Sequence, residues 1–271
     1  MLMIQIEIIV LLAVLGATFG SFAGAMAWRL KTKRTMVNDR SECEACHHKL
    51  GVGDLIPVFS WLFLRGRCRY CGAPIGVLPL AAEVGIASLF AVSYVYWPLG
   101  FGEWQGITLF VLWLGYLVAL AVLLIYDARW MILPDKIVLP LVFIAFIDAA
   151  LRVSLMPGAG AADYVLYAGF GMTALAGIYG ALYVVSRGRW VGFGDVKLSV
   201  FIGVTLGWQK ALLVFILANV IGFCVVLPGL LMRKLGRTSR IPFGPFLIAG
   251  FIAAGLWGDV LIHWYLSYIG L

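Results

Sequence analysis

Residues 106–126 of the chain read GITLFVLWLGYLVALAVLLIY, and none of these 21 side chains is charged. An α-helix needs about 20 mostly apolar residues to cross roughly 30 Å of hydrocarbon, so this stretch predicts a transmembrane helix. The whole chain agrees, because 63% of its 271 residues are hydrophobic and only 12% are charged. A soluble domain has about 25% charged residues and fewer apolar ones. This composition excludes an ordinary cytosolic enzyme, a disordered chain and a secreted disulfide scaffold, and it indicates a multi-spanning membrane protein.

Seven further apolar stretches accompany this one along the chain. The first lacks the basic start and the small-residue cleavage site of a signal peptide, so we expect it to be retained as a span. The eight predicted spans, of which the sixth is short, are Ile4–Leu30, Leu80–Pro98, Gly106–Tyr126, Ile137–Leu155, Tyr164–Ser186, Leu198–Gly207, Ala211–Met232 and Phe243–Ile269. The predicted fold class is an all-α polytopic membrane protein with about eight transmembrane helices.

The basic residues are distributed unevenly among the predicted loops. Of the 20 Lys and Arg residues, all except Arg152 and Lys210 lie in or beside the segments that follow the first, third, fifth and seventh spans. Loops rich in Lys and Arg face the cytoplasm. We therefore expect these loops on the cytoplasmic side and both termini outside. The net charge of +7 is then explained by membrane topology.

The largest predicted loop, residues 31–79, separates a first helix (residues 1–30) from a region of about seven helices (residues 80–271). It carries Cys43-x2-Cys46 and Cys68-x2-Cys71, with 21 residues between the two pairs. Two such pairs are typical of tetrahedral Zn²⁺ ligation by four thiolates. A segment of this size with few large apolar residues needs such a metal to fold. We expect a small cytoplasmic zinc-ribbon-like domain here.

Alternatives remain for the residues of this loop. Disulfides or free thiols would also explain the cysteines, although a reducing cytoplasm disfavours persistent disulfides. His47 and His48 could replace a thiolate ligand, but we expect them to be solvated. Arg65, Arg67 and Arg69 could bind nucleic acid, but attraction to anionic lipid is the favoured interpretation. The expected partner is therefore the lipid bilayer and not a nucleic acid.

Some carboxylates in or near the predicted spans have local explanations. Asp148 precedes Arg152 by four residues and Asp259 precedes His263 by four, so each pair can meet on one helix face. Glu83, close to the start of the second predicted helix, is typical of an acidic residue in a first helical turn.

Asp135 follows Pro134 and precedes an apolar run, which is the position of a helix N-cap.

Asp127 and Asp195 lack such explanations. Asp127 ends the third predicted helix, where the helix dipole disfavours an anion. Asp195 follows Gly192 and Gly194, which would allow another segment to approach the carboxylate closely. Both are expected at the same membrane face. Two carboxylates that converge on one water molecule are the machinery of aspartic proteolysis, although paired Asp residues also bind metals and relay protons.

Several motifs occur together along nearly the whole chain. They are Gly20-Ser21-Phe22, Arg29-Leu30, the two Cys pairs, Asp54-Leu55-Ile56-Pro57, Ser60-Trp61-Leu62, Asp127-x6-Pro134-Asp135, Gly192-x-Gly194-Asp195-x-Lys197-Leu198 and Pro242-Phe243-Gly244-Pro245-Phe246. In this order they resemble the bacterial type IV prepilin peptidases (prepilin leader peptidase/N-methyltransferases), intramembrane aspartic proteases of the GxGD kind.

The resemblance implies cleavage of a short basic leader from type IV prepilins or type II secretion pseudopilins, at a Gly–Phe junction on the cytoplasmic side of the bacterial inner membrane. It assigns catalysis to Asp127 and Asp195. It assigns support of the active site to four neighbours, which are Gly192, Gly194, Lys197 and Asp135. The four cysteines would hold structural Zn²⁺.

The resemblance also implies methylation of the new N-terminus with S-adenosylmethionine. Two departures from the family pattern lie in the part of the chain linked with that activity. Lys31 replaces the Pro that usually follows Arg29-Leu30, and Leu78-Pro79-x3-Glu83 replaces Tyr-Pro-x-x-Glu. Arg29 and Glu83 are therefore candidate methyltransferase-linked residues.

Three competing interpretations are kept. The first is a peptidase without methyltransferase activity. The second is an ion-coupled transporter in which Asp127, Asp195 and Lys197 relay ions and the zinc domain is regulatory. The third is a membrane-anchored zinc-ribbon adaptor, for which both Asp residues would be replaceable.

Overall fold

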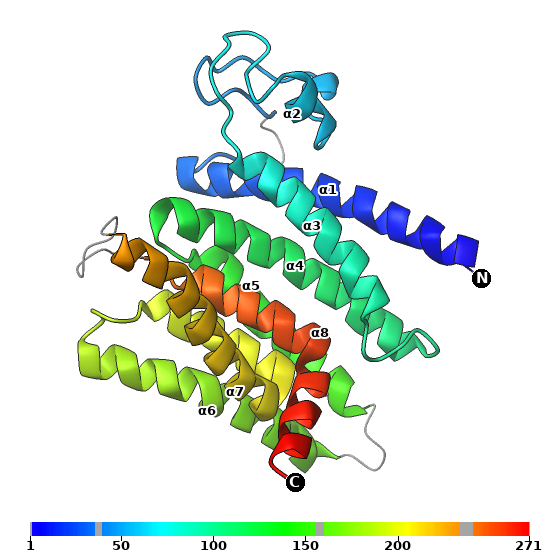
Figure 1. Cartoon of the computed structure of the whole chain (residues 1–271), viewed down its shortest axis with the longest axis vertical. Helices are drawn as coiled ribbons and strands as arrows, with labels where there is room; N and C mark the ends of the chain where they lie inside the picture. The colour runs from blue at the N-terminus through cyan, green and yellow to red at the C-terminus, as the bar shows by residue number, and fades with distance from the viewer. Residues whose placement is uncertain (1, 36–39, 155–159, 233–240, 271) are drawn as a thin grey trace. The chain divides into compact units, whose positions relative to one another are not determined.

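The computed structural model describes residues 2–35, 40–154, 160–232 and 241–270 of the chain (Figure 1). Within these ranges it is helical, with no strand and only two isolated β-bridges. Its elements are α1 (Leu2–Thr32), the 3-10 helix η1 (Val52–Asp54), α2 (Phe59–Phe63), α3 (Leu78–Val95), α4 (Trp104–Trp130), α5 (Asp135–Ser154), α6 (Ala161–Ser186), α7 (Phe193–Leu231) and α8 (Gly244–Tyr268). Seven of these helices, all except α2 and η1, are long and apolar enough to cross a membrane.

The chain forms two compact units. The first contains Met1–Tyr96 and Leu114–Tyr126, and the second contains Trp97–Trp113 and Asp127–Leu271. Helix α4 supplies its middle to the first unit and its two ends to the second. The proposed division into a first helix, a cysteine domain and a helical region stays a prediction.

In the first unit, α1 packs along α3 (Figure 1). Two glycines of α1 make this contact close. A Cβ atom on Gly16 would lie 2.7 Å from the Ile86 carbonyl oxygen, and one on Gly20 would lie 2.5 Å from the Cα atom of Glu83. Small residues allow helix backbones to approach in this way. Because α3 begins at Leu78, Glu83 lies in the second turn and not in the predicted first turn.

In the second unit, α6 packs against the beginning of α7 with the two helices antiparallel. The rings of Tyr183 and Phe193 lie 5.4 Å apart at the end of α6. Farther from that end, Gly171 and Gly203 bring the two backbones into direct contact, and a Cβ atom on either would overlap the carbonyl group of the other. A pair of glycines therefore sets the spacing of these two helices.

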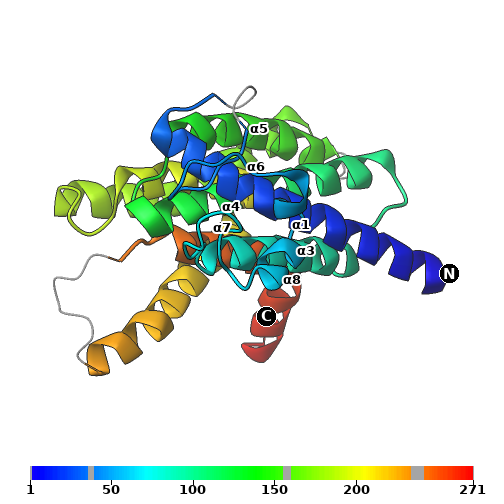
Figure 2. The ribbon, with the colours of Figure 1, turned by 90° about the horizontal axis from the view of Figure 1, so that it is seen from above.

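Helix α7 reverses its direction at Gly207. This residue has φ 76° and ψ 171°, a conformation that favours glycine, and it packs on the ring of Tyr167 near the start of α6. Eight residues later, the ring of Phe215 lies 5.7 Å from that of Tyr179, which is back toward the end of α6. The chain therefore runs out along residues 193–206, the first arm, and returns along residues 208–231, the second arm (Figure 2).

This reversal accounts for the difference between seven helices of spanning length and the predicted count of about eight. The predicted spans Leu198–Gly207 and Ala211–Met232 correspond to the two arms of α7, on either side of its reversal at Gly207. The first arm has 14 residues and is about 21 Å long at 1.5 Å per residue, against roughly 30 Å of hydrocarbon. A short first arm is what the short sixth stretch of the sequence predicted.

The second arm of α7 packs antiparallel on α8. Gly222 lies against the ring of Phe246 near the start of α8, and Gly250 lies against Val214 farther along both helices. The N-terminus of α8 is thereby held beside the end of the second arm, which positions it for the site described below.

Two of the predicted ion pairs have different outcomes. Arg152 donates to Asp148 at 2.7 Å, four residues away on α5, as predicted. Asp259 instead accepts a hydrogen bond from Lys210 at 2.8 Å, so the predicted pairing with His263 is wrong. The packing of α8 on the second arm brings this lysine, 49 residues distant in sequence, to the carboxylate.

Candidate active site and metal centre

Asp127 lies in the last turn of α4 and is only 5% exposed. Gly244, the first residue of α8, packs on it so closely that a Cβ atom there would lie 2.7 Å from Oδ2 of Asp127. Among the described residues, this buried oxygen has no hydrogen-bond partner. A buried polar atom without a partner is costly, so Asp127 presents a group that a water molecule or a substrate can satisfy.

Asp195 is the third residue of α7 and is 9% exposed. Its Oδ2 accepts a hydrogen bond of 3.1 Å from the backbone N–H of Gly192, the residue before the helix. An acidic side chain that caps a helix N-terminus in this way is stabilised as an anion. The sequence run Gly192-Phe193-Gly194-Asp195 thus fixes the carboxylate at the start of the first arm.

Leu133 packs between Gly194, the residue before Asp195, and Gly244, the residue that packs on Asp127. A Cβ atom on Gly194 would lie 2.9 Å from Cβ of Leu133, and one on Gly244 would lie 3.6 Å from its Cδ2. The Leu133 side chain thus links the surroundings of Asp127 and Asp195. The structure therefore brings together two carboxylates that are 68 positions apart in the sequence.

Lys197 and Asp135 form an ion pair beside this site. The Lys197 ammonium group lies 2.7 Å from Oδ1 of Asp135 and 4.8 Å from the centroid of the Phe193 ring. Asp135 is the first residue inside α5, and Pro134, whose carbonyl accepts the first hydrogen bonds of the helix, occupies the cap position predicted for Asp135. The Asp135 carboxylate instead binds a residue of α7. The pair ties the start of α5 to the start of the first arm.

Two carboxylates placed in this way are suited to general acid–base chemistry, because one can accept a proton while the other donates one. In the part of the chain that the structure describes, the only cluster of three or more metal-ligating side chains is the group of four cysteines.

Sequence reasoning assigned no role to three residues that shape this site. Leu133 and Gly244 lie inside motifs quoted above, but only their contacts identify them as spacers. Tyr179 is 1% exposed and its ring lies 5.5 Å from that of Phe243, the residue before Gly244. The sequence marks Tyr179 only as a tyrosine within an apolar helix, where a buried hydroxyl needs a hydrogen-bond partner. In the structure, Nδ2 of Asn219 lies 3.4 Å from this hydroxyl.

The four cysteines of the large loop come together as predicted. Their Sγ atoms all lie within 4.8 Å of one another, and those of Cys43 and Cys71 are 3.9 Å apart. Four thiolates about 2.3 Å from one Zn²⁺ ion in a tetrahedron would be separated by about 3.8 Å. The cluster therefore fits this ion, and all four residues are free thiols.

Two backbone turns with the same hydrogen bonds supply these sulfurs. In the first, the Cys43 N–H donates to the carbonyl of His48 and the His47 N–H donates to the carbonyl of Cys43. In the second, the Cys68 N–H donates to the carbonyl of Ala73 and the Gly72 N–H donates to the carbonyl of Cys68. His47 (φ 57°) and Gly72 (φ 70°) occupy the equivalent left-handed position. Each Cys-x2-Cys pair thus builds its own turn.

The thiols of this cluster influence one another. Backbone N–H groups of Cys71 and Tyr70 lower the pKa of Cys68 to about 7. The N–H of Ala73 favours the Cys71 thiolate too, but the neighbouring thiols, led by Cys46, raise the pKa of Cys71 to about 12. Several thiolates this close together need a cation between them.

The two histidines beside the cluster have other contacts. His47 Nδ1 lies 3.0 Å from a carboxylate oxygen of Glu42, and the ring of His48 lies 3.7 Å from that of Tyr70. Neither is among the four clustered side chains. These contacts agree with the expectation that both histidines are loop residues.

Asp54 joins the loop between the cysteine pairs to the second turn. Its carboxylate accepts hydrogen bonds from the Gly51 N–H at 3.1 Å, the Tyr70 hydroxyl at 3.1 Å and Arg69 Nε at 2.7 Å. Burial acts to raise the pKa of Asp54, but these three donors together lower it. Arg69, considered above for nucleic acid or lipid, is engaged within the domain.

Glu83 connects the cysteine domain to α3 within the first unit. It is 7% exposed, and its Oε2 accepts a hydrogen bond of 2.7 Å from the backbone N–H of Val58. Val58 has φ 63° and ψ −54°, and the Phe59 N–H lies 2.6 Å from the Pro57 carbonyl. This is a γ-turn of the rare, strained kind, and a β-branched residue in it needs external support. The other candidate methyltransferase-linked residue, Arg29, lies in the last turn of α1.

Comparison with known proteins gives two family matches that cover most of the chain. Residues 14–97 match the model of the bacterial peptidase A24 N-terminal domain. Residues 114–227 match the model of the type IV leader peptidase family. No solved structure matches the fold.

Curated relatives carry the name prepilin leader peptidase/N-methyltransferase. The protein of Aeromonas hydrophila is 36% identical over 84% of this chain and 75% of its own length. That of Pseudomonas aeruginosa is 34% identical over 87% of this chain and 77% of its own length. That of Bacillus subtilis is 28% identical over 95% of this chain and 97% of its own length. The similarity therefore extends over the cysteine domain and the aspartate site alike.

Proposed function

This chain belongs to the type IV leader peptidase family, and we propose that it is a membrane aspartic endopeptidase for type IV prepilins or type II secretion pseudopilins. It removes a short basic leader at a Gly–Phe junction and then methylates the new N-terminus with S-adenosylmethionine. Asp127 and Asp195 are the proposed catalytic residues.

The buried Oδ2 of Asp127, which lacks a hydrogen-bond partner among the described residues, is the observation that carries the peptidase proposal. Asp195, ionised at the helix N-terminus, takes a proton from a water molecule, and that water attacks the scissile carbonyl carbon. Asp127, protonated, donates its proton to the carbonyl oxygen. When the tetrahedral intermediate collapses, Asp195 passes its proton to the amide nitrogen, Asp127 takes back a proton from the intermediate's hydroxyl group, and the C–N bond breaks.

Four further residues support this pair in the proposal. Gly192 donates its N–H to Asp195, and Gly194 leaves room for Leu133. Lys197 and Asp135 hold the starts of α7 and α5 together. Fixed carboxylates are what acid–base catalysis requires, because small displacements of a catalytic group lower the rate strongly.

We propose that Cys43, Cys46, Cys68 and Cys71 hold one structural Zn²⁺ ion. When bound, the ion supplies a closed tetrahedral site that stabilises a fold without a large apolar core. The distances between the sulfur atoms support this assignment. The ion has no proposed part in peptide cleavage.

The methyl transfer is proposed from family membership, with Glu83 and Arg29 as linked residues. Glu83 is a positioning residue in this proposal, because its Oε2 binds the Val58 N–H and so holds the strained turn of the cysteine domain. We assign no residue to the methyl donor.

Glu83→Ala and Glu83→Gln test that role. The alanine variant should retain leader cleavage and lose most of the methylation, whereas the glutamine variant, which keeps an acceptor oxygen, should restore it. Intact mass of the mature pilin measures both steps. Equal methylation by wild type and Glu83→Ala would contradict the positioning role.

The proposed location is the bacterial inner membrane, with both termini outside and the cysteine domain and active site at the cytoplasmic face. The concentration of Lys and Arg in one set of loops supports this orientation. The reversal of α7 at Gly207 supports it as well, because two arms return the chain to the face from which it started.

Incubation of the detergent-purified protein with a full-length prepilin tests the peptidase proposal. We expect loss of the leader at the Gly–Phe bond and, with S-adenosylmethionine present, one added methyl group. Asp259→Asn, which alters an exposed ion pair elsewhere in the same unit, is the control and should cleave normally. Cation flux in proteoliposomes without any cleavage would contradict the proposal and favour a transporter.

A further inference from the structure

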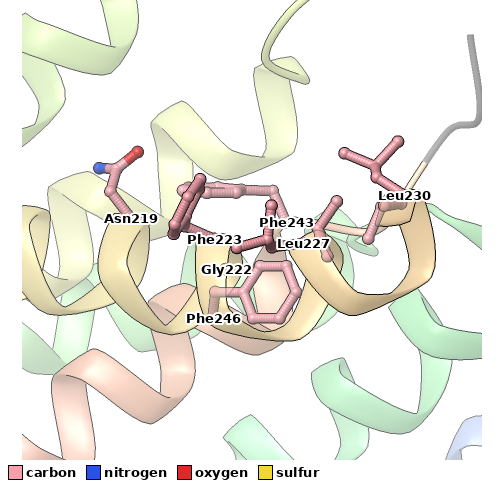
Figure 3. Close-up of a pocket in the computed structure, with 9 residues that line it drawn as sticks. Asn219, Gly222, Phe223, Leu227, Leu230, Phe243 and Phe246 are labelled. Carbon is pink, nitrogen blue, oxygen red and sulfur yellow. The ribbon is translucent and has the colours of Figure 1, made fainter. Parts of the chain in front are cut away.

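A cavity of about 260 Å³, open on one side to the surface of the protein, lies between the second arm of α7 and the beginning of α8 (Figure 3). Phe223 and Leu227 line it from α7, and Phe243 and Phe246 line it from the α8 side. Among the described residues that line it, Asn219 has the only polar side chain. The cavity is therefore suited to an apolar group, because burial of apolar surface is its main source of affinity.

The cavity lies next to the aspartate site, because consecutive residues of the chain contact each of them. Phe243 lines the cavity, and the next residue, Gly244, packs on Oδ2 of Asp127. Tyr179 contacts the same wall, since its ring lies 5.5 Å from that of Phe243 and its hydroxyl lies 3.4 Å from Nδ2 of Asn219. A peptide bound at Asp127 would therefore have its neighbouring side chains within reach of this cavity.

The size of the cavity limits its occupant. An apolar cavity of about 150 Å³ already holds benzene, whereas sites for drug-sized ligands usually enclose about 300–1,000 Å³. At about 260 Å³, the space between α7 and α8 matches one large apolar side chain. It is too small for a whole nucleoside cofactor.

We propose that this cavity is the subsite for one apolar side chain in the first helical turn of the mature pilin, on the C-terminal side of the scissile bond. The proposal rests on the peptidase function stated above and adds a specificity determinant to it. The occupant is a substrate side chain, because the Phe243–Gly244 peptide joins the cavity directly to the carboxylate of Asp127.

Val226 and Val225 provide a matched pair of positions for the test. Val226 lines the cavity, whereas Val225, the adjacent residue of the same helix, is 60% exposed and lies outside the lining. A tryptophan at Val226 fills the cavity, and a tryptophan at Val225 adds the same bulk to the outer face.

The experiment measures kcat/KM for a parent prepilin and for four substrates in which positions 1 to 4 of the mature chain are replaced by alanine in turn. Val226→Trp should lower kcat/KM for the parent about tenfold or more. For one alanine substrate, the loss should shrink to about threefold or less. Val225→Trp should cleave all five substrates like wild type.

An unchanged loss in all four alanine substrates, or no loss with the parent, would overturn the subsite. Val226→Ala decides the case in which Val226→Trp fails to fold. This variant enlarges the cavity, so a substrate with tryptophan at the responsive position should gain kcat/KM relative to the parent substrate. If the ratio of these two kcat/KM values is the same as for the wild-type enzyme at every position, the subsite is overturned. Failure of the wild-type protein to cleave any substrate would instead overturn the peptidase function, and the subsite with it.

Discussion

The metal cluster takes its four sulfurs from two similar backbone turns, whereas the aspartate site takes its groups from the ends of several helices. Each cysteine turn is complete within about six residues, from Cys43 to His48 in the first case. The aspartate site instead needs the end of α4, the starts of α7 and α8, and Leu133 between them. The first region is therefore organised locally, around four thiols that could share one ion, while the second is organised by packing and depends on close contacts at glycine residues.

This difference predicts that the two regions fail in different ways. The cysteine domain should fail when a ligand is removed, because the proposed ion stabilises a fold that lacks a large apolar core. The aspartate site should fail when a methyl group is added at a crowded glycine, because Gly244 already packs against the Asp127 carboxylate and leaves no room there for a Cβ atom.

The largest expected effect is the loss of one ligand. Cys68→Ser should abolish stoichiometric zinc binding and unfold the cysteine domain, since structural Zn²⁺ contributes about 10 kcal/mol or more to such folds. Zinc content by mass spectrometry and limited proteolysis of residues 40–76 measure this. Cys224→Ser is the control, because Cys224 is exposed in α7 and outside the cluster. Full zinc retention in Cys68→Ser would contradict the assignment.

A single methyl group should have the next largest effect. In Gly244→Ala the new Cβ would lie 2.7 Å from Oδ2 of Asp127, so the carboxylate or α8 must shift, and kcat should fall about 100-fold. Gly177→Ala is the matched control, because a Cβ atom at this position of α6 meets nothing within 4 Å. Comparable thermal unfolding midpoints would show that both variants are folded. Unchanged kcat in Gly244→Ala would contradict a role for the close packing of Gly244 on Asp127.

The two regions also differ in how far the sequence predicts them. Spacing alone predicts the metal cluster, because each Cys-x2-Cys pair forms its own turn. The convergence of Asp127 and Asp195 depends on contacts between segments far apart in the chain, and Leu133 has no sequence feature that marks it as a spacer. The resemblance to a family supplied the roles of the two aspartates before any contact was known.

The same limit explains the differences in the fold. Hydropathy predicted both arms of α7 and the end of the first arm at Gly207. It did not predict that the helix continues directly on both sides of this glycine, without a loop between the arms. Spacing on one helix predicted an Asp259–His263 pair, and the packing of α7 on α8 supplied Lys210 instead.

A smaller effect is expected from the ion pair beside the active site. Lys197→Met should lower kcat/KM about fivefold or less, since a partly exposed ion pair contributes about 1 kcal/mol or less. Asp135→Asn should have a similar effect, and the double variant should be no worse than either one. Losses that multiply in the double variant would mean that the two residues act separately.

The smallest effect concerns the pH dependence of the cysteine domain. Burial raises the pKa of Asp54, but the donors Gly51, Tyr70 and Arg69 outweigh it and lower the pKa. The folded-state pKa thus lies below the unfolded value of about 3.9. The stabilisation is complete above that value and is lost as the pH falls through the folded pKa.

Limited proteolysis of wild type and Asp54→Asn across pH measures this contribution. The difference in resistance between the two proteins should be constant from about pH 8 to pH 5 and should shrink below about pH 4. A difference that grows on acidification would contradict the hydrogen-bonding account of Asp54.

Cleavage of one prepilin by wild type, Asp127→Asn and Asp195→Asn in parallel tests the central claim most directly. If the two carboxylates act on one water molecule, each single variant should lose leader cleavage by about 1,000-fold or more, and the double variant should be no slower than the singles. Thermal unfolding midpoints near that of wild type would confirm that the variants are folded. Full leader cleavage by either single variant would contradict the aspartate pair.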